Sequence, residues 1–264
     1  MNKRTYNLNH RDIPLNEKEV HIWNFDLNNI SDENKQALIG LLSKDEIERA
    51  SKFHFDIDRE RFICRSGLLR LFISFYTNIS PKVISYKHNN YGKPELSREQ
   101  NKSKLHFNMS HSQNMLCIGF LRNKQIGVDI EVIKPINDYL GVANKFFSDS
   151  EIVQLNSFPE EKALEVFYTC WTGKEAFIKL SGEGLSYPLK EFATQIKVLK
   201  IGETYRYKLL VKNLEENFLV EAFRLQENQV GACAIRDESI ETIYWFFEEN
   251  NYSTNKFIGD TLSK

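Results

Sequence analysis

The sequence predicts an α+β fold built as two halves that repeat one order of elements. Three observations support this expectation. The chain has 264 residues, which suits one large domain or two modest ones. Segments with strand periodicity and segments with helix periodicity follow one another along both halves. With 41% hydrophobic residues, 12 Gly and 6 Pro, the composition is that of a folded globular protein and excludes a disordered or fibrous chain.

The first half, residues 1–122, is expected to contain strands around two helices. Alternating apolar residues predict a strand at 20–25. Ser43 followed three residues later by Glu46 is a capping-box pattern, which predicts the start of a helix. A second helix is expected at 58–76, where apolar residues gather near one side. Two further strands are expected at 105–109 and 115–121.

The second half, residues 123–240, shows the same order of elements, and residues 241–264 read as a C-terminal tail. A first strand is expected at 126–132, and helices follow at 138–146, 148–156 and 161–180. Strands then close the half near 192–199, 205–211, 217–225 and 230–236. The identity between the two halves is slight, so an internal duplication is a hypothesis.

Charge and cysteine usage exclude several classes of protein. Lys and Arg total 35 and Asp and Glu total 36, a formal net charge of −1, which argues against a nucleic-acid binder. No run approaches the roughly 18 apolar residues of a membrane span, and the first residues lack the apolar core of a signal peptide. The 4 cysteines are scattered in apolar contexts. We therefore expect reduced, buried thiols and a cytosolic protein.

The strand at 126–132 carries two acids at alternate positions. Asp129 and Glu131 would point one way while the apolar residues between them point into the core. Two adjacent carboxylates suit Mg²⁺, which binds one or two carboxylates together with water and phosphate oxygens. A strand with one solvated face would give the same pattern, so the residues alone leave both interpretations open.

The helix at 161–180 places Trp171, Glu175 and Lys179 at intervals of four residues, on one stripe. Glu175 could add a third carboxylate, and Lys179 could neutralise phosphate oxygens. A surface ion pair beside a packed Trp171 would explain the spacing equally well. Gly173 costs about 1 kcal/mol relative to alanine in a helix, which indicates close packing.

Two further residues suit contacts with an anion. His111 lies between Ser110 and Ser112 where the first hairpin turns, and could donate to a phosphate or satisfy a backbone group of the turn. Lys93 lies in a Gly-Lys-Pro turn, which could present its ammonium to a phosphate. The sequence has no glycine-rich phosphate loop and no zinc-binding histidine pair.

Five segments, taken together and in order, resemble the 4′-phosphopantetheinyl transferases, and specifically the larger Sfp-type (surfactin-synthetase-activating) class. They are YGKP at 91–94, FNMSHS at 107–112, GVDIEVIKPI at 127–136, KFFSDSE at 145–151 and FYTCWTGKEAFIKLSGEGLSYPL at 167–189. Each segment alone is a weak signal, whereas five in the family's order are strong. The resemblance therefore favours the functional interpretation of the acids over the structural one.

The resemblance implies two similar halves packed about a pseudo-twofold axis, with coenzyme A in the cleft between them. It implies a holo-[acyl-carrier-protein] synthase, which transfers the phosphopantetheine arm to a serine of an acyl or peptidyl carrier protein and releases adenosine 3′,5′-bisphosphate. By the same resemblance, Asp129, Glu131 and Glu175 would hold Mg²⁺, with Glu175 also the favoured base, and residues 134–147 would lie beside the carrier protein. The residues that would contact the phosphates of the coenzyme are Lys93, Ser110, His111, Lys179 and Arg61.

Two other functions remain open from the sequence. One is another Mg²⁺-dependent phosphoryl or nucleotidyl transferase that uses the same acids. The other is a non-catalytic module that binds coenzyme A or a carrier protein. The expected partners are a carrier protein and coenzyme A, without nucleic acid or membrane, and the two-half layout favours a cytoplasmic monomer.

Overall fold

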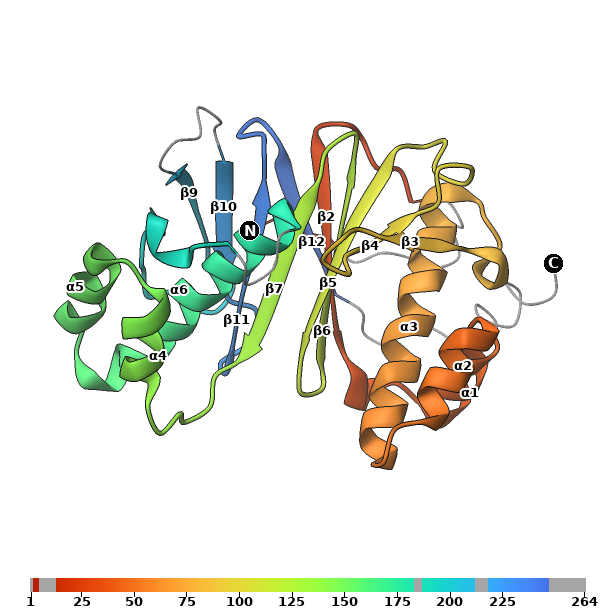
Figure 1. The fold of residues 1–264 in the computed structure, drawn as a ribbon, viewed down its shortest axis with the longest axis horizontal. Helices are drawn as coiled ribbons and strands as arrows, with labels where there is room; N and C mark the ends of the chain where they lie inside the picture. Colours follow the sequence, from red (N-terminus) through yellow and green to blue (C-terminus); the bar gives the residue numbers. More distant parts are fainter. Residues whose placement is uncertain (1, 5–12, 183–186, 212–217, 247–264) are drawn as a thin grey trace.

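The computed structural model describes residues 2–4, 13–182, 187–211 and 218–246. They form a mixed α+β fold in four layers, helix–sheet–sheet–helix, as Figure 1 shows. The two sheets lie face to face in the middle of the molecule, and each is covered on its outer side by helices.

Sheet 1, on the right in Figure 1, has the strand order β1-β12-β2-β6-β5. Its strands are β1 (Asn2–Arg4), β12 (Glu241–Phe246), β2 (Glu19–Asp26), β6 (Met115–Arg122) and β5 (Leu105–Ser112). Helices α1 (Asp32–Ile39), α2 (Lys44–Ser51) and α3 (Asp56–Thr77) cover it. A separate hairpin joins β3 (Tyr86–His88) to β4 (Pro94–Leu96).

Sheet 2 is antiparallel throughout, with the strand order β7-β11-β10-β9-β8. Its strands are β7 (Ile126–Val132), β11 (Gln229–Ile235), β10 (Phe218–Phe223), β9 (Thr204–Val211) and β8 (Phe192–Ala193). Helices α4 (Tyr139–Phe146), α5 (Asp149–Ser157) and α6 (Glu160–Ser181) cover its outer face.

The strands of the two sheets are apolar on both faces because each sheet lies between helices and the other sheet. In β6, Leu116 and Ile118 pack into the core beneath α1–α3, whereas Cys117 packs into the core between the sheets. In β7, Val128 and Ile130 belong to this same intersheet core. The two sheets therefore share one apolar core, and burial of its surface holds them together.

Local signals fix the helix ends. Ser43 and Ser148 each cap a helix whose third residue is a glutamate, and both capping boxes are formed. The predicted box at Ser43 is thus confirmed. The two long helices end at residues in the left-handed conformation, Asn78 at φ 58° after α3 and Gly182 at φ 76° after α6.

The structure corrects one expected strand and adds one helix. Only Phe192–Ala193 of the strand expected at 192–199 is a strand. The backbone N–H groups of Thr194 and Ile196 instead donate to side chains of α5, so these two groups are not available to pair with a strand. Helix α1, at Asp32–Ile39, was not anticipated from the sequence.

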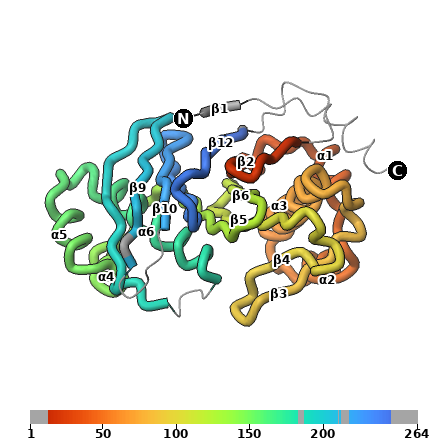
Figure 2. The backbone as a smooth tube through the Cα atoms, turned by 90° about the horizontal axis from the view of Figure 1, so that it is seen from above, coloured from red at the N-terminus to blue at the C-terminus, as the bar shows by residue number. Residues whose placement is uncertain are grey.

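The start of the expected tail is also corrected, since residues 241–246 form β12 and pair in parallel with β2. Figure 2 shows β12 running beside β2. Its Ile243 and Trp245 enter the core under α1–α3, while Tyr244 enters the intersheet core. The pairing joins segments more than 200 residues apart, which a local pattern does not reveal. Residues 247–264 lie outside the described part of the chain.

The cysteine prediction is confirmed: Cys64, Cys117, Cys170 and Cys233 are all buried and free. Among the described helices, none combines the length and apolarity that crossing a membrane requires.

Candidate functional site

The candidate site lies where the edge strands of the two sheets meet. β5 and β7 are those edges, and they lie side by side. Side chains of β5 bridge them: Asn108 Oδ1 accepts from the backbone N–H of Val128 at 2.8 Å, and Ser112 Oγ accepts from that of Val132 at 3.2 Å. These bonds set the position of β7, the strand that carries Asp129 and Glu131, relative to the other half.

Asp129 is the buried centre of this region, with 3% of its surface exposed. Ser110 Oγ donates to its Oδ1 at 2.7 Å, and the Lys179 ammonium lies 2.6 Å from the same oxygen. Lys179 also donates to Ser110 Oγ at 2.8 Å. Three predicted site residues from β5, β7 and α6 therefore meet. Burial raises the pKa of the Asp129 carboxyl, and Lys179 opposes that rise.

Glu131 and Glu175 flank Asp129 on the strand and on the helix. Ser112 Oγ donates to Glu131 Oε2 at 2.6 Å, and burial raises the pKa of Glu131. Burial, followed by the charge of Asp129, raises the pKa of Glu175 to about 7. Both Asp129 and Glu131 contribute to this shift, so the three carboxylates are within electrostatic range of one another.

The described residues contain no preformed group of three or more His, Cys, Asp and Glu side chains that could hold a metal ion. Lys179 occupies one oxygen of Asp129 instead. The other, Asp129 Oδ2, is buried without a hydrogen-bond partner in the described part of the chain. An orphaned buried carboxylate oxygen, with two further carboxylates nearby, is a donor set that fits a hard divalent cation.

A cluster of basic side chains on α3 lies within electrostatic range of His111 on β5. Arg61 and Arg65 lie one helical turn apart on α3. His111 is exposed as a whole, but desolvation of its ring, with further contributions from Arg65 and Lys179, lowers its pKa to about 4. Burial also lowers the pKa of Arg65 to about 10, with Arg61 and Arg49 adding to the shift. Cations that repel one another in this way would be stabilised by a multiply charged anion.

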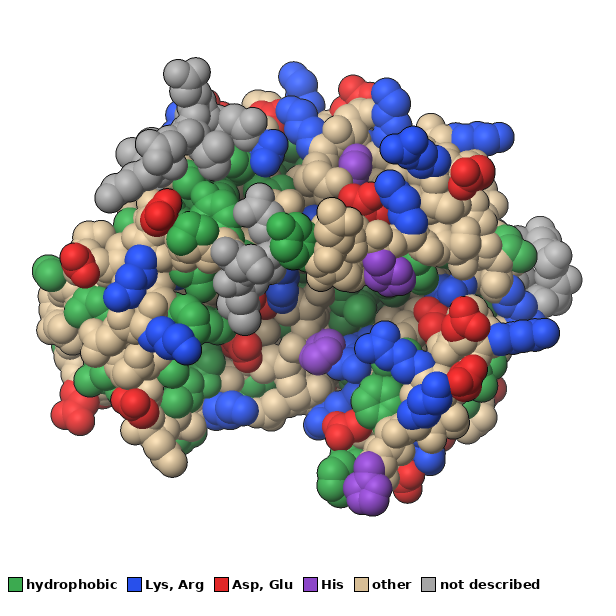
Figure 3. Space-filling model, viewed as in Figure 1, with side chains coloured by type: hydrophobic (Ala, Val, Ile, Leu, Met, Phe, Trp, Pro, Cys, Tyr) green, Lys and Arg blue, Asp and Glu red, His purple; other side chains and the backbone are tan. Residues whose placement is uncertain are grey.

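Figure 3 shows histidine and basic side chains gathered around the hollow between the two halves. Of the basic residues in this region, sequence reasoning selected Arg61 and His111 but gave no role to Arg65. The spacing of four residues between Arg61 and Arg65 was the available signal, because it places both on one face of α3.

Lys93 makes different contacts from the other predicted site residues. Its ammonium donates to the carbonyl oxygens of Lys179 at 2.7 Å and Ile126 at 3.0 Å, and to Gln125 Oε1 at 3.2 Å. Burial lowers its pKa to about 8. Lys93 thus supports the end of α6 and the start of β7, and a phosphate contact would require its ammonium to leave these oxygens.

Close packing of α6 on β7 depends on Gly127. A Cβ atom there would lie 1.9 Å from the carbonyl oxygen of Ala176 and 2.4 Å from the backbone nitrogen of Leu180. A second glycine, Gly173, faces Tyr207, whose hydroxyl oxygen would be 2.5 Å from an added Cβ. The glycine at 173 therefore reflects the close packing that was expected.

The sequence also allowed purely structural interpretations of Asp129, Lys179 and Trp171, and the structure gives a different answer for each. The solvated-strand interpretation of Asp129 is wrong, since the residue is buried. Lys179 forms its ion pair with Asp129, and the described residues show no pair between Lys179 and Glu175. Trp171 does pack, against the rings of Phe146 and Phe167.

Comparison with known protein families gives two matches in separate parts of the chain. A sequence model of the 4′-phosphopantetheinyl transferase superfamily matches residues 125–233. A second, of the N-terminal part of 4′-phosphopantetheinyl transferases, matches residues 28–119. The first contains β7 and α6, and the second contains α3 and β5, so both sides of the site fall within matched segments.

Individual proteins are similar over most of their length. The 4′-phosphopantetheinyl transferase HetI of Nostoc sp. is 35% identical over 174 residues, 66% of this chain and 73% of that protein. The 4′-phosphopantetheinyl transferase psf-1 of Bacillus pumilus is 30% identical over 239 residues, 89% of this chain and 98% of that protein. The transferase Sfp of Bacillus subtilis is 32% identical over 167 residues, 63% of this chain and 72% of that protein.

Proposed function

The chain belongs to the 4′-phosphopantetheinyl transferase superfamily, and we propose that it transfers the phosphopantetheine arm of coenzyme A to a serine of an acyl or peptidyl carrier protein. Adenosine 3′,5′-bisphosphate would be the other product. The observation that carries the proposal is the meeting of acids and cations at one place. Asp129, Glu131 and Glu175 lie within electrostatic range of one another, and Lys179 is bonded to Asp129. Lys179 and the α3 arginines Arg61 and Arg65 are in turn within electrostatic range of His111.

The acids would bind a divalent cation, and we propose Mg²⁺ because all the donors are carboxylate oxygens. Asp129 would contribute its orphaned Oδ2, and Glu131 and Glu175 would provide the other protein oxygens. When bound, the ion would neutralise charge that develops on the pyrophosphate as the leaving group departs.

The cations would hold the coenzyme by its phosphates. We propose that His111 and Arg61, from β5 and α3, bind the phosphate of the ribose, since Arg61 and Arg65 are within electrostatic range of the neutral His111 ring, which would gain a proton beside a phosphate. Ser110 and Lys179 lie against Asp129 and would contact the pyrophosphate. Lys93 would join them only if its ammonium left the carbonyl oxygens that it now binds.

Proton transfer is assigned to Glu175. A general base works best when its pKa is close to the working pH, and the pKa of this carboxyl is raised to about 7. Glu175 would accept the proton of the serine hydroxyl, directly or through a water molecule, as that oxygen attacks the β-phosphorus. Catalysis would otherwise consist of positioning and charge neutralisation, as is usual for phosphoryl transfer.

The carrier protein would approach along residues 134–147, which include α4. Leu140 on this helix is 43% exposed, an apolar side chain available to a partner. We further propose that the two halves, divided near residue 122, are related by a pseudo-twofold axis, and that the protein acts as a cytoplasmic monomer.

The proposal is tested by incubating the purified protein with coenzyme A, Mg²⁺ and a panel of apo carrier proteins. Mass spectrometry should show a gain of about 340 Da on a carrier protein, the mass of the phosphopantetheine arm. The gain should disappear in a carrier protein whose acceptor serine is replaced by alanine. A nucleotidyl transferase would give a different added mass, and a binding module would give none.

A further inference from the structure

A fully buried ion pair lies behind the proposed catalytic helix. The ammonium of Lys174 on α6 is 2.8 Å from Glu151 Oε2 on α5, and both side chains are 0% exposed. Lys174 also donates to the carbonyl oxygens of Leu189 at 2.8 Å and Phe192 at 2.9 Å. The three N–H groups of the ammonium thus have three acceptors, and they connect α6 to α5 and to the segment at 189–192.

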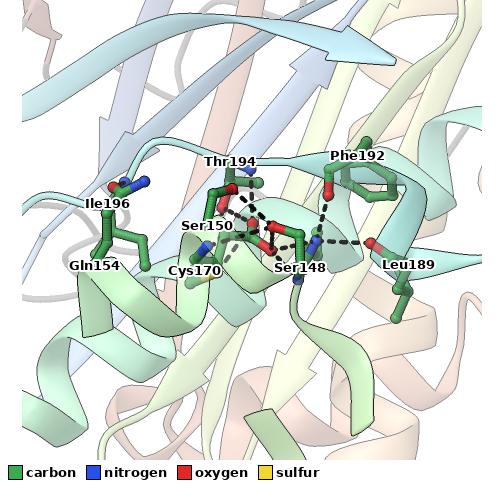
Figure 4. Close-up of polar contacts among 10 residues, drawn as sticks. Ser148, Ser150, Gln154, Cys170, Leu189, Phe192, Thr194 and Ile196 are labelled. Atoms are coloured by element: carbon green, nitrogen blue, oxygen red, sulfur yellow. Dashed lines mark hydrogen bonds and ion pairs between the residues drawn. The ribbon is translucent and has the colours of Figure 1, made fainter. Parts of the chain in front are cut away.

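Both carboxylate oxygens of Glu151 also have hydrogen-bond partners. Its Oε2 accepts from the backbone N–H of Ser148 at 2.8 Å, which completes the capping box of α5. Its Oε1 accepts from the backbone N–H and the hydroxyl of Thr194, both at 2.6 Å, and from the Cys170 thiol at 3.3 Å. Figure 4 shows Ser148, Thr194, Leu189 and Phe192 arranged around this centre.

The N-terminal half contains the same arrangement. Glu46 completes the capping box of α2 and is 2.6 Å from the guanidinium of Arg70 on α3. The side chain of Arg70 is 2% exposed. Arg70 donates to the carbonyl oxygens of Pro81 at 2.7 Å and Ile84 at 3.0 Å, in the segment that follows its helix.

Each half therefore joins a capping-box glutamate, a buried cation of a 22-residue helix and two carbonyl oxygens after that helix. The sequence Ser-x-x-Glu-Ile occurs at the start of both units, at 43–47 and at 148–152. This shared arrangement supports the internal duplication that the slight identity of the two halves left as a hypothesis. We call each pair with its carbonyl partners a lock, the N-lock at Arg70 and the C-lock at Lys174.

The C-lock differs from the N-lock because its lysine is followed on the same helix by the proposed catalytic residues. Successive residues of an α-helix point about 100° apart, so a side chain fixed at 174 determines the direction of the side chain at 175. Lys179, five residues after Lys174, is about 140° around the helix and shares the face of Glu175. Both then face β7, where Lys179 bonds Asp129.

We propose that Lys174 is a positioning residue, and that the C-lock fixes the rotation of α6 and so directs Glu175 and Lys179 toward β7. This inference rests on the proposed function for the roles of those two residues. Buried ion pairs contribute little net stability compared with apolar packing, but their directional bonds specify one geometry. The ammonium has one arrangement that satisfies all three acceptors, whereas an apolar side chain would allow α6 to rotate.

The experiment compares two matched double variants of the full chain. K174M with E151Q removes the C-lock, and R70M with E46Q removes the N-lock. Each replaces a buried pair by neutral side chains of similar size, and glutamine still completes a capping box. The readouts are the thermal unfolding midpoint, Mn²⁺ binding measured by electron paramagnetic resonance without coenzyme A, and the Mg²⁺ dependence of carrier loading. Coenzyme A is left out of the Mn²⁺ measurement because α3, which the N-lock holds, carries the arginine proposed to bind it.

We expect Mn²⁺ affinity to fall about 10- to 100-fold in K174M/E151Q, as happens when residues that orient metal ligands are removed. In R70M/E46Q it should stay within about twofold of the wild type, because that lock does not touch α6. The single variant K174M should be less stable than the double variant, since it leaves Glu151 charged and unpaired. Adding E151Q to K174M should restore stability but leave the Mn²⁺ affinity low.

Two results would overturn the inference. In one, K174M/E151Q unfolds at a lower temperature but binds Mn²⁺ as the wild type does. In the other, the two double variants lose affinity equally, which would indicate a general loss of stability. If wild-type protein binds Mn²⁺ but loads no carrier protein, the proposed function fails while the binding comparison still tests the lock.

Discussion

Ser110 Oγ donates to Asp129 Oδ1 across 2.7 Å, and this bond joins the edge strand of one sheet to the edge strand of the other. The carboxylate is not free for solvent, because Lys179 lies on the same oxygen. Its second oxygen has no hydrogen-bond partner among the described residues. Protein contacts thus hold Asp129 Oδ1, whereas Oδ2 is the oxygen that a cation could bind.

Replacing single carboxylates should strongly reduce turnover without unfolding the protein. In Asp129→Asn and Glu175→Gln, we expect carrier loading to fall by at least about 10²- to 10³-fold, the usual effect of losing one preorganised electrostatic group. Initial rates at saturating Mg²⁺ measure this loss, with circular dichroism as the check on folding. Glu33→Gln, at an exposed position on α1, is the matched control and should keep its activity. Wild-type rates in either site variant would remove that residue from the mechanism.

Ser112 should affect the Mg²⁺ dependence of the rate although it is not a proposed metal ligand. Its hydroxyl donates to Glu131 at 2.6 Å and accepts from the backbone of Val132, so it fixes the orientation of that acid. In Ser112→Ala we expect the Mg²⁺ concentration for half-maximal rate to rise about 10- to 100-fold. Ser85→Ala removes an exposed hydroxyl that bonds Ser97 and serves as the control. An unchanged Mg²⁺ dependence would show that Glu131 needs no such support.

His111 provides a prediction about pH. With its pKa lowered to about 4 in the folded state, it is neutral at pH 7, whereas in the unfolded chain it takes up a proton near 6.5. The unfolded state therefore binds more protons between these values, so the contribution of His111 to stability is present above about pH 6.5 and is lost as the pH falls toward 4.

Binding of coenzyme A should raise the pKa of His111, because a phosphate dianion favours the imidazolium. A nuclear magnetic resonance titration of the His111 ring with and without coenzyme A measures both values. Arg65→Gln should also raise the pKa in the free protein, since Arg65 is the charge that contributes most to lowering it. A pKa that coenzyme A leaves unchanged would place the phosphates away from this side chain.

Gly127→Ala should destabilise the protein by more than an ordinary overpacking change. The added Cβ would lie 1.9 Å from a carbonyl oxygen of α6, and neither backbone can move without separating β7 from the helix. We expect a loss of about 3 kcal/mol or more in urea unfolding. Gly202→Ala is the comparison: its φ of 82° strains an alanine, but no atom lies within 4 Å, so about 1 kcal/mol is expected. Similar losses in the two variants would contradict the packing argument.

Much of the local structure could be predicted because it depends on neighbours in sequence. The capping box at Ser43 and the strand at 126–132 lie where their patterns indicate. β12 and the segment after Ala193 could not be predicted, since one pairs with β2 near the other end of the chain and the other bonds to side chains of α5. In both cases the partner is distant in sequence, and propensity contains no information about it.

By itself, the sequence determined which residue types stand on the site elements: acids at alternate positions of one strand, and an acid and a lysine four residues apart on one helix. Only the tertiary structure decided the partners. It paired Lys179 with Asp129, placed the Lys93 ammonium on carbonyl oxygens and buried Lys174 against Glu151. The physical reason is that backbone geometry sets the direction of a side chain, whereas its partner and its burial depend on which surfaces the packed core brings together.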